Sequence, residues 1–293
     1  MDPEQAWKPP PDEPTAELWK EDPSKAIFDP LRSVRRLVVI DVMNFLHKAA
    51  ESAHPQYRRP PEDTLDYLDA LDLAALLYFF LRRSFDVRAV IPRSARYRAK
   101  NGYLFDIYYC MGLLVYADNC YDDLPTIDIA SRRHGVIVSC DKYRDILALQ
   151  IGSNKRRLLE ERVICPTLTP FKAPDGAMVT KLANGDMVVH FLTHLTVESH
   201  TQLYSHPDSL DFACVAYFRA AFTPTRRAKL LANLDEVFEF VPRVTALADD
   251  NEYVRQIADY KNAIVDRWRA ECCFKRIDEV TYSWAQRYQP FQS

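Results

Sequence analysis

Residues 113–141, with the sequence LLVYADNCYDDLPTIDIASRRHGVIVSCD, predict a strand, a helix and a second strand. Two short apolar runs, at 113–116 and 136–138, flank a segment that opens with acids and carries Pro125 near its start. Acids and proline favour the first turn of a helix, and Gly135 is placed to end that helix. A strand, a helix and a strand in this order are typical of a parallel βαβ unit.

The same alternation extends toward the N-terminus. Apolar runs at 37–40 (LVVI) and 87–91 (VRAVI) predict two more strands. Leucines and aromatic residues recur at helical spacing in 63–85, and 100–112 predicts a shorter helix. Helices that alternate with short apolar strands predict a three-layer α/β domain with a parallel sheet of at least four strands.

The two ends of the chain differ from this middle part. Residues 1–33 are rich in prolines and acids, a composition that favours neither helix nor sheet. Residues 154–162 predict a helix, and 178–191 predict a β-hairpin that turns at Asn184 and Gly185. From about residue 207 only helical patterns remain. The predicted division is a proline-rich arm (1–33), an α/β domain (34–204) and a helical C-terminal segment (205–293).

Composition restricts the classes of function. Hydrophobic residues make up 48% of the 293 residues and charged residues 27%, which excludes a disordered chain. The formal net charge of −3 gives no overall attraction to nucleic acid, so RNA binding has to come from local patches. The sequence shows neither a run of apolar residues long enough for a bilayer nor a signal-peptide pattern. We therefore expect no membrane partner and a cytoplasmic location, with the nucleus as the alternative.

The cysteines form neither a CxxC pair nor a spacing typical of a zinc site. We expect them to be reduced and mostly buried. The seven positions are Cys110, Cys120, Cys140, Cys165, Cys214, Cys272 and Cys273.

Acidic residues follow three of the four predicted strands. They are Asp41 after the first run, Asp118, Asp122 and Asp123 after the third, and Asp141 and Asp145 after the fourth. Because the carboxyl ends of parallel strands form one edge of a sheet, where ligands bind, these carboxylates should converge. Carboxylates that share a crevice repel one another unless a cation lies among them, and oxygen ligands suit Mg²⁺ or Mn²⁺. Asn44 could add an amide contact to a phosphate or a water.

Each acid also has a plainer explanation. Asp122 and Asp123 stand where a helix begins and could act as helix caps. Asp145 could pair with Arg144 or Arg156 on a helix surface. The metal-site interpretation therefore depends on several strand-terminal acids occurring together.

Three segments resemble the NYN ribonuclease domain of the Regnase type, a branch of the PIN-like nucleases. They are VVIDVMNFLH (38–47), CYDDLPTIDIASRRHGVIVSCDKYRD (120–145) and EERVICP (160–166), and the resemblance spans residues 36 to about 195. It implies a PIN-like, three-layer, doubly wound parallel sheet, followed here by a helical C-terminal appendage. It also implies endonucleolytic cleavage of single-stranded or loop RNA with Mg²⁺, for which Mn²⁺ could substitute.

The resemblance assigns a role to each matching residue. The matching positions around the family's metal are Asp41, Asn44, Asp122, Asp123, Asp141 and Asp145. By this resemblance Asp41, Asp123 and Asp141 hold the metal ion. Asp122 and Asp145 bind it through water or orient its ligands.

Three features depart from the family pattern. Val42 and Met43 replace the small residues that follow the first aspartate. The basic loop that precedes CYDD in Regnase-type enzymes is almost absent. No CCCH zinc finger follows the domain, and a helical segment occupies that place. We therefore expect a different device for binding RNA or a partner.

Two basic patches are candidates for RNA binding. In PRSARYRAKNGY, basic side chains alternate with tyrosines directly after the second strand, a combination suited to phosphates and unpaired bases. The second patch lies in NKRRLLEER, which also fits an exposed helix with internal ion pairs. The candidate residues are Arg93, Arg96, Tyr97, Arg98, Lys100, Lys155 and Arg156.

The sequence therefore predicts a Mg²⁺-dependent endoribonuclease in RNA decay or RNA silencing. One alternative is a catalytically weak scaffold of an RNA-silencing complex, in which the C-terminal helices bind a protein partner or a related NYN subunit. Another is a phosphohydrolase with an aspartate nucleophile. That chemistry requires a second acid two residues after the first, to protonate the leaving group. Position 43 is methionine, so this last alternative fits poorly.

Overall fold

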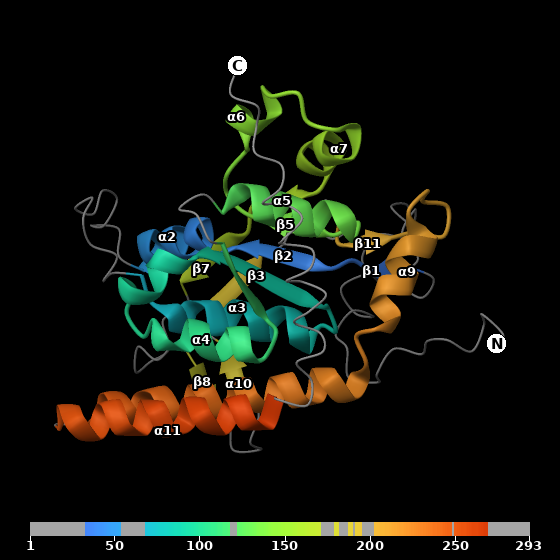
Figure 1. The fold of residues 1–293 in the computed structure, drawn as a ribbon. Coiled ribbons are helices and arrows are strands. Elements are labelled where there is room, and N and C mark those ends of the chain that lie inside the picture. Colours follow the sequence, from blue (N-terminus) through green and yellow to red (C-terminus); the bar gives the residue numbers. More distant parts are fainter. Residues whose placement is uncertain are drawn as a thin grey trace.

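The computed structural model describes residues 33–53, 68–117, 122–170, 179–181, 187–189, 191–194, 202–247 and 249–268. Its centre is a parallel sheet in the order β4-β3-β2-β5-β6 (Figure 1). The strands are β2 (Val38–Asp41), β3 (Val87–Pro92), β4 (Leu114–Ala117), β5 (Val136–Val138) and β6 (Val163–Ile164). The four predicted strands are confirmed. The sequence analysis missed β6, which has two residues and no run of its own.

The strand order reverses between β2 and β5. The first strand of the main sheet is β2, in its middle. The next strands, β3 and β4, follow outward on one side of β2, and β5 then pairs with the other side of β2. In open parallel sheets this switch point is where ligands bind, at the carboxyl ends of the strands. The C-terminal residue of β2 is Asp41.

Helices cover both faces of the sheet, which confirms the three-layer doubly wound fold (Figure 1). Val38 and Ile40 of β2 pack into one core, and Val39 between them packs into the other, as the alternation of side chains along a strand requires. The first core includes α2 (Val42–Ala53), α3 (Ala70–Arg82) and α4 (Tyr103–Cys110). The second includes α5 (Asp123–Arg132), α6 (Arg144–Leu147) and α7 (Ser153–Glu161).

The end of α5 differs from the prediction. His134, not Gly135, adopts the left-handed conformation, with φ of 50°, and the amide of Gly135 donates to the carbonyl of Ala130 (2.8 Å). A Cβ atom at position 135 would lie 2.7 Å from the carbonyl oxygen of Leu37. Glycine is therefore needed here because the chain passes close to the start of β2.

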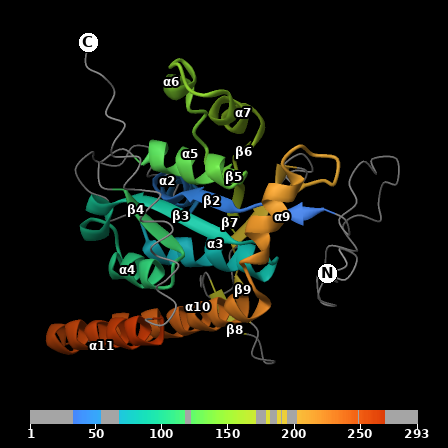
Figure 2. The same cartoon turned by 45° about the vertical axis from the view of Figure 1, so that its right-hand side comes forward.

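The C-terminal segment is helical as predicted, as far as it is described. It contains α9 (Phe212–Ala220), α10 (Pro224–Thr245) and α11 (Asp250–Trp268). Thr223 caps α10 by accepting a hydrogen bond from the amide of Arg226 (3.1 Å). Apolar side chains of α10 and α11 join the same core as α3 and α4, on the face shown at the bottom of Figures 1 and 2. The segment thus extends the hydrophobic core of the α/β layers.

Three two-stranded antiparallel pairs lie outside the main sheet. β1 (Val34–Arg35) pairs with β11 (Tyr204–Ser205), and β7 (Thr167–Pro170) pairs with β10 (Phe191–His194). β8 (Val179–Lys181) pairs with β9 (Met187–Val189), which confirms the predicted hairpin strands. The turn at Asn184 and Gly185 lies outside the described residues, as does the predicted arm up to residue 32. Across the described helices, none has both the length and the apolar character that crossing a bilayer requires.

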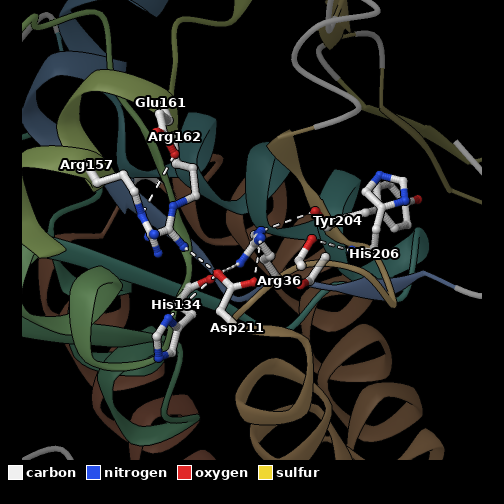
Figure 3. Close-up of polar contacts among 10 residues, drawn as sticks. Arg36, His134, Arg157, Glu161, Arg162, Tyr204, His206 and Asp211 are labelled. Carbon is white, nitrogen blue, oxygen red and sulfur yellow. Dashed lines mark hydrogen bonds and ion pairs between the residues drawn. The ribbon is translucent and has the colours of Figure 1, made fainter. Parts of the chain in front are cut away.

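A buried ion cluster connects Asp211, directly before α9, to Arg36 and Arg162, which precede β2 and β6 (Figure 3). Arg36 forms a bidentate pair with Asp211, at 2.7 and 3.1 Å, and Arg162 lies 3.4 Å from the same carboxylate. Burial opposes ionisation of Asp211, but hydrogen bonds from Arg36 and Ser205 outweigh it and lower its pKa to about 2. Asp211 is therefore ionised and holds α9 beside β1 (Figure 2).

Candidate active site

Asp41 stands at the junction of β2 and α2 and is only 1% exposed. Its Oδ1 accepts a hydrogen bond from the backbone amide of Asn44 (3.2 Å), and its Oδ2 accepts one from the Asn44 side-chain amide (2.7 Å). The spacing of Asp41 and Asn44 therefore has a local structural role, because the helix turns the asparagine back onto the carboxylate. Contact of Asn44 with a phosphate or a water stays a prediction.

The loop after β5 supplies two more donors to Asp41. Ser139 Oγ donates to Asp41 Oδ2 (2.8 Å), and the Tyr143 hydroxyl donates to the same oxygen (3.0 Å). Tyr143 is fully buried and has a left-handed backbone with φ of 48°. Burial, together with the nearby Asp41 carboxylate, raises the pKa of Tyr143 far above its usual value, so its hydroxyl remains a donor.

Asp141 shapes this loop. Its backbone amide donates to Ser139 Oγ (3.0 Å), and its Oδ1 accepts from the amide of Tyr143 (2.9 Å). The side chain therefore closes a tight turn between the two residues that hold Asp41. Asp145 lies one turn further on, exposed in the first turn of α6.

Asp122 and Asp123 lie at the start of α5, which follows β4, whereas the loop of Asp141 follows β5 on the other flank of β2. Asp122 occupies the N-cap position but makes no side-chain cap hydrogen bond, in contrast to the capping alternative. Its Oδ2 is buried and has no hydrogen-bond partner among the described residues. Burial, followed by repulsion from Asp41 and a smaller repulsion from Asp123, raises the pKa of Asp122 to about 7.

The predicted convergence of the acidic side chains is therefore seen for some of them only. The repulsions show that Asp41, Asp122 and Asp123 share one electrostatic environment. Within the described ranges, however, no three histidine, cysteine, aspartate or glutamate side chains are arranged to hold a metal ion. Asp41 Oδ2 faces its hydrogen-bond donors and Asp141 Oδ1 faces its own loop.

The first basic patch lies at the carboxyl end of β3, on the 3₁₀ helix η4 (Arg93–Tyr97) and the residues after it. Tyr97 is 75% exposed, and the Arg96 guanidinium lies 5.1 Å from its ring centroid. Arg93 lies 5.0 Å from the ring centroid of Tyr116, and Arg98 is exposed. The exposed tyrosine and its neighbouring arginines are placed to meet a ligand at the same edge as the acids.

Part of this basic charge is paired within the protein. Arg96 Nη2 lies 2.6 Å from Asp106 Oδ2, and Lys100 Nζ lies 3.4 Å from Asp69 Oδ2. Lys261 of α11 also binds Asp106 (2.6 Å), and the Tyr116 hydroxyl donates to it (2.9 Å). Asp106 thus joins the basic loop, β4 and the C-terminal helix.

The second basic patch lies on α7. Lys155 forms an ion pair with Asp128, and Arg156 pairs with Glu160 (3.7 Å) while donating to the carbonyl of Leu147 (3.1 Å). Only the Arg156–Glu160 pair is internal to the helix, as the exposed-helix interpretation expects, because Asp128 belongs to α5. RNA contact at this patch stays a prediction.

Sequence reasoning missed Ser139, Tyr143 and Lys261. Ser139 and Tyr143 stand inside the motif that carried the family resemblance, and a polar residue directly after a buried strand was the available signal. Lys261 had no such signal, because its partner lies 155 residues away.

Comparison with known families identifies the domain. The profile of the Zc3h12a-like Ribonuclease NYN domain matches residues 34–181, half of the chain. The match includes β2, α2, the start of α5, the loop after β5 and α6, which together carry all six acidic and amide positions. No curated protein matches the chain significantly. The chain therefore belongs to the Zc3h12a-like ribonuclease NYN family, as the resemblance to Regnase-type domains predicted.

Proposed function

We propose that this ribonuclease domain cuts single-stranded or loop RNA internally and requires Mg²⁺, or Mn²⁺ in its place. One observation carries the proposal. A buried carboxylate oxygen of Asp122 has no hydrogen-bond partner among the described residues. Burial, followed by repulsion from Asp41, raises the pKa of Asp122 to about 7. A buried carboxylate without a hydrogen-bond partner destabilises the folded protein when it is ionised, and a bound cation removes this destabilisation.

The donor set fits a hard divalent cation in its chemistry. Oxygen ligands are what Mg²⁺ prefers, and it usually keeps several waters instead of a complete protein cage. Although the described side chains form no ready metal-holding group, the family resemblance assigns the ion to Asp41, Asp123 and Asp141, with Asp122 and Asp145 around it. When bound, the ion supplies a nucleophilic water and neutralises charge that develops on the phosphodiester. In-line attack at phosphorus with the 3′ oxygen leaving gives a 5′-phosphate and a 3′-hydroxyl.

The chain's own residues orient the central carboxylate. Asn44, Ser139 and Tyr143 all donate to Asp41 Oδ2, while Oδ1 has one longer bond of 3.2 Å to a backbone amide. A carboxylate oxygen has about two lone-pair directions, so Oδ1 retains one for a ligand. Three donors on one oxygen therefore fix the direction in which the other oxygen points.

RNA would lie along the carboxyl edge of the sheet. Arg93 and Arg98 would neutralise phosphates, and the exposed ring of Tyr97 would stack on an unpaired base. Arg96 and Lys100 would also approach the RNA, and each is paired with an aspartate in the free protein. Lys155 and Arg156 would contact a longer RNA from α7.

A second candidate is a protein-binding scaffold of an RNA-silencing complex. The large apolar side chains of Leu210 (96% exposed) and Tyr217 (77%), before and within α9, favour a protein partner on that surface. A partner and an active nuclease site are compatible, because α9 lies beside β1 and away from the carboxyl edge (Figure 2).

The test is cleavage of a circular single-stranded RNA, which only an endonuclease can open. We expect wild type to linearise the circle in Mg²⁺ and not in EDTA, and Asp141→Asn to be at least tenfold slower. Equal rates with EDTA, or with the Asp141→Asn variant, would refute the proposed mechanism. Activity restored by Mn²⁺ after EDTA treatment would support it.

A further inference from the structure

Two cysteine thiols lie against each other next to the candidate active site. Cys165 directly follows β6, Cys140 follows β5 by two residues, and their Sγ atoms are 2.8 Å apart. The register of the two strands places them there, because Val138 is paired with Ile164 and the Ser139 amide donates to the Ile164 carbonyl (3.0 Å). The contact is therefore a property of the sheet.

We infer that Cys140 and Cys165 form a redox-active pair, and that their disulfide switches off RNA cleavage. The pair itself depends only on the geometry of β5 and β6. The effect on cleavage rests on the proposed function.

Access to the pair is open from the Cys165 side. Cys165 is exposed and Cys140 is partly exposed, which corrects the expectation that the cysteines are mostly buried. Of the other described cysteines, Cys214 is exposed on α9 and Cys110 is partly exposed on α4. Cys120, Cys272 and Cys273 lie outside the described residues. An oxidant in solution therefore reaches Cys165 before Cys140.

A peroxide is the oxidant class that fits, and the reaction balances without further reagents. The Cys165 thiolate attacks one oxygen of hydrogen peroxide, the O–O bond breaks, and hydroxide leaves and takes up a proton as water. Cys140 then loses its proton and its sulfur displaces hydroxide from the Cys165 sulfenic acid, which forms the S–S bond and a second water. Two thiols are oxidised and one peroxide is reduced to two waters. A dithiol reverses the step by exchange.

The disulfide would act on the residues that hold Asp41. Cys140 lies between Ser139, which donates to Asp41 Oδ2 (2.8 Å), and Asp141, which donates to Ser139 Oγ (3.0 Å). A disulfide has an S–S length of about 2.05 Å, so bond formation draws the two sulfur atoms together by ~0.8 Å from 2.8 Å. Displacements of about 1 Å in supporting groups can cost roughly 10²-fold in rate. We expect oxidation to slow cleavage at least tenfold.

The experiment treats the full chain with hydrogen peroxide, removes the peroxide with catalase and blocks remaining thiols with N-ethylmaleimide. Trypsin then releases HGVIVSCDK (134–142) and VICPTLTPFK (163–172), each with a single cysteine. Mass spectrometry measures the linked peptide, and RNA cleavage is measured on the same samples. The variant is Cys165→Ser, and the matched control is Cys214→Ser, which removes another exposed thiol.

We expect the linked peptide in wild type and in Cys214→Ser, with a loss of cleavage that dithiothreitol restores. Cys165→Ser should keep its cleavage rate after peroxide. If Cys140 and Cys165 are both alkylated by N-ethylmaleimide after peroxide treatment, the proposal that they form a disulfide is wrong. A linked peptide in an enzyme that still cleaves at full rate, or equal loss in Cys165→Ser, would overturn the switch. If the reduced enzyme does not cleave RNA, the proposed function fails, whereas a linked peptide still supports the pair.

Discussion

The hydroxyl of Tyr143 donates a 3.0 Å hydrogen bond to Oδ2 of Asp41, although 102 residues separate the two in sequence. The bond crosses the switch point of the sheet, from the loop after β5 to the end of β2. Both residues are buried. Because the pair joins the two strands between which the order reverses, it fixes the central carboxylate of the candidate active site.

Tyr143→Phe should slow RNA cleavage while preserving the fold. The substitution removes one hydrogen bond to a charged group, which is worth roughly 1.5–3 kcal/mol, and keeps the buried ring. We expect a fall of about tenfold or more in kcat with little change in KM. The matched control is Tyr108→Phe, which removes a buried hydroxyl bound to the Ala70 carbonyl (3.2 Å), away from the acids. Equal loss of kcat in both variants would contradict a specific role for Tyr143.

The pKa of Asp122 gives the protein a pH dependence with a defined sign. Its pKa is about 7 in the folded chain against an ordinary value of 3.8, so the folded state disfavours the carboxylate. The destabilisation is absent below about pH 4, grows as pH rises and is complete above about pH 7. Asp122→Asn should therefore raise the free energy of unfolding at pH 8 by on the order of 2 kcal/mol, after allowance for partial solvent exposure.

Urea denaturation of wild type and Asp122→Asn at pH 4 and pH 8, without divalent cations, measures this difference. At pH 4 the two proteins should have the same stability. If Asp122→Asn is less stable than wild type at pH 8, the ionised Asp122 carboxylate does not destabilise the folded protein. Addition of Mg²⁺ should stabilise wild type at pH 8 more than Asp122→Asn.

Asp106 should be important for stability. It accepts from Tyr116 and pairs with both Arg96 and Lys261, so Asp106→Asn would leave two cations around a neutral group. We expect a loss of roughly 2–4 kcal/mol in the free energy of unfolding, since removing one partner of a buried pair is costly. Arg255→Ala, which breaks an exposed pair with Glu252 on α11, is the control and should change stability little. Similar denaturation midpoints for wild type and Asp106→Asn would contradict this role.

Tyr97→Ala should weaken RNA binding without affecting stability. The ring is 75% exposed, so it contributes little to packing, whereas stacking on a base is worth about 1–3 kcal/mol. We expect the Kd for a single-stranded RNA to rise about fivefold to a hundredfold. Tyr217→Ala removes a tyrosine of similar exposure (77%) from α9 and should leave the Kd unchanged. Fluorescence anisotropy with labelled RNA measures the Kd of both variants. The same Kd for Tyr97→Ala and Tyr217→Ala would show that the RNA does not stack on Tyr97.

Four strands of the parallel sheet and most of the helices between them were predictable, because the strands are apolar runs and those helices have clear periodicity. Both β6 and α2 were missed for physical reasons. β6 has two residues, and α2 begins at Val42 directly after β2, with no turn residue to mark the boundary. Convergence of Asp41 with Asp122 and Asp123 followed from strand topology alone, because parallel strands carry their last residues to one edge.

The details of the site required the structure. Sequence does not tell which way a carboxylate turns, and Asp141 closes a turn with the amide of Tyr143. The contact of Cys140 with Cys165 depends on the register between β5 and β6, which one residue of slippage would abolish. Pairing of Lys261 with Asp106 depends on how α11 packs on α4.

The most direct test of the central claim compares Mg²⁺-dependent RNA cleavage by wild type, Asp41→Asn and Asp208→Asn. Asp41 is the carboxylate on which Asn44, Ser139 and Tyr143 converge, whereas Asp208 is an exposed acid in the turn before α9. The account predicts that Asp41→Asn loses at least a hundredfold in kcat at saturating Mg²⁺ and that Asp208→Asn cleaves like wild type. Cleavage by Asp41→Asn at the wild-type rate, or by wild type in the absence of any divalent cation, would contradict it.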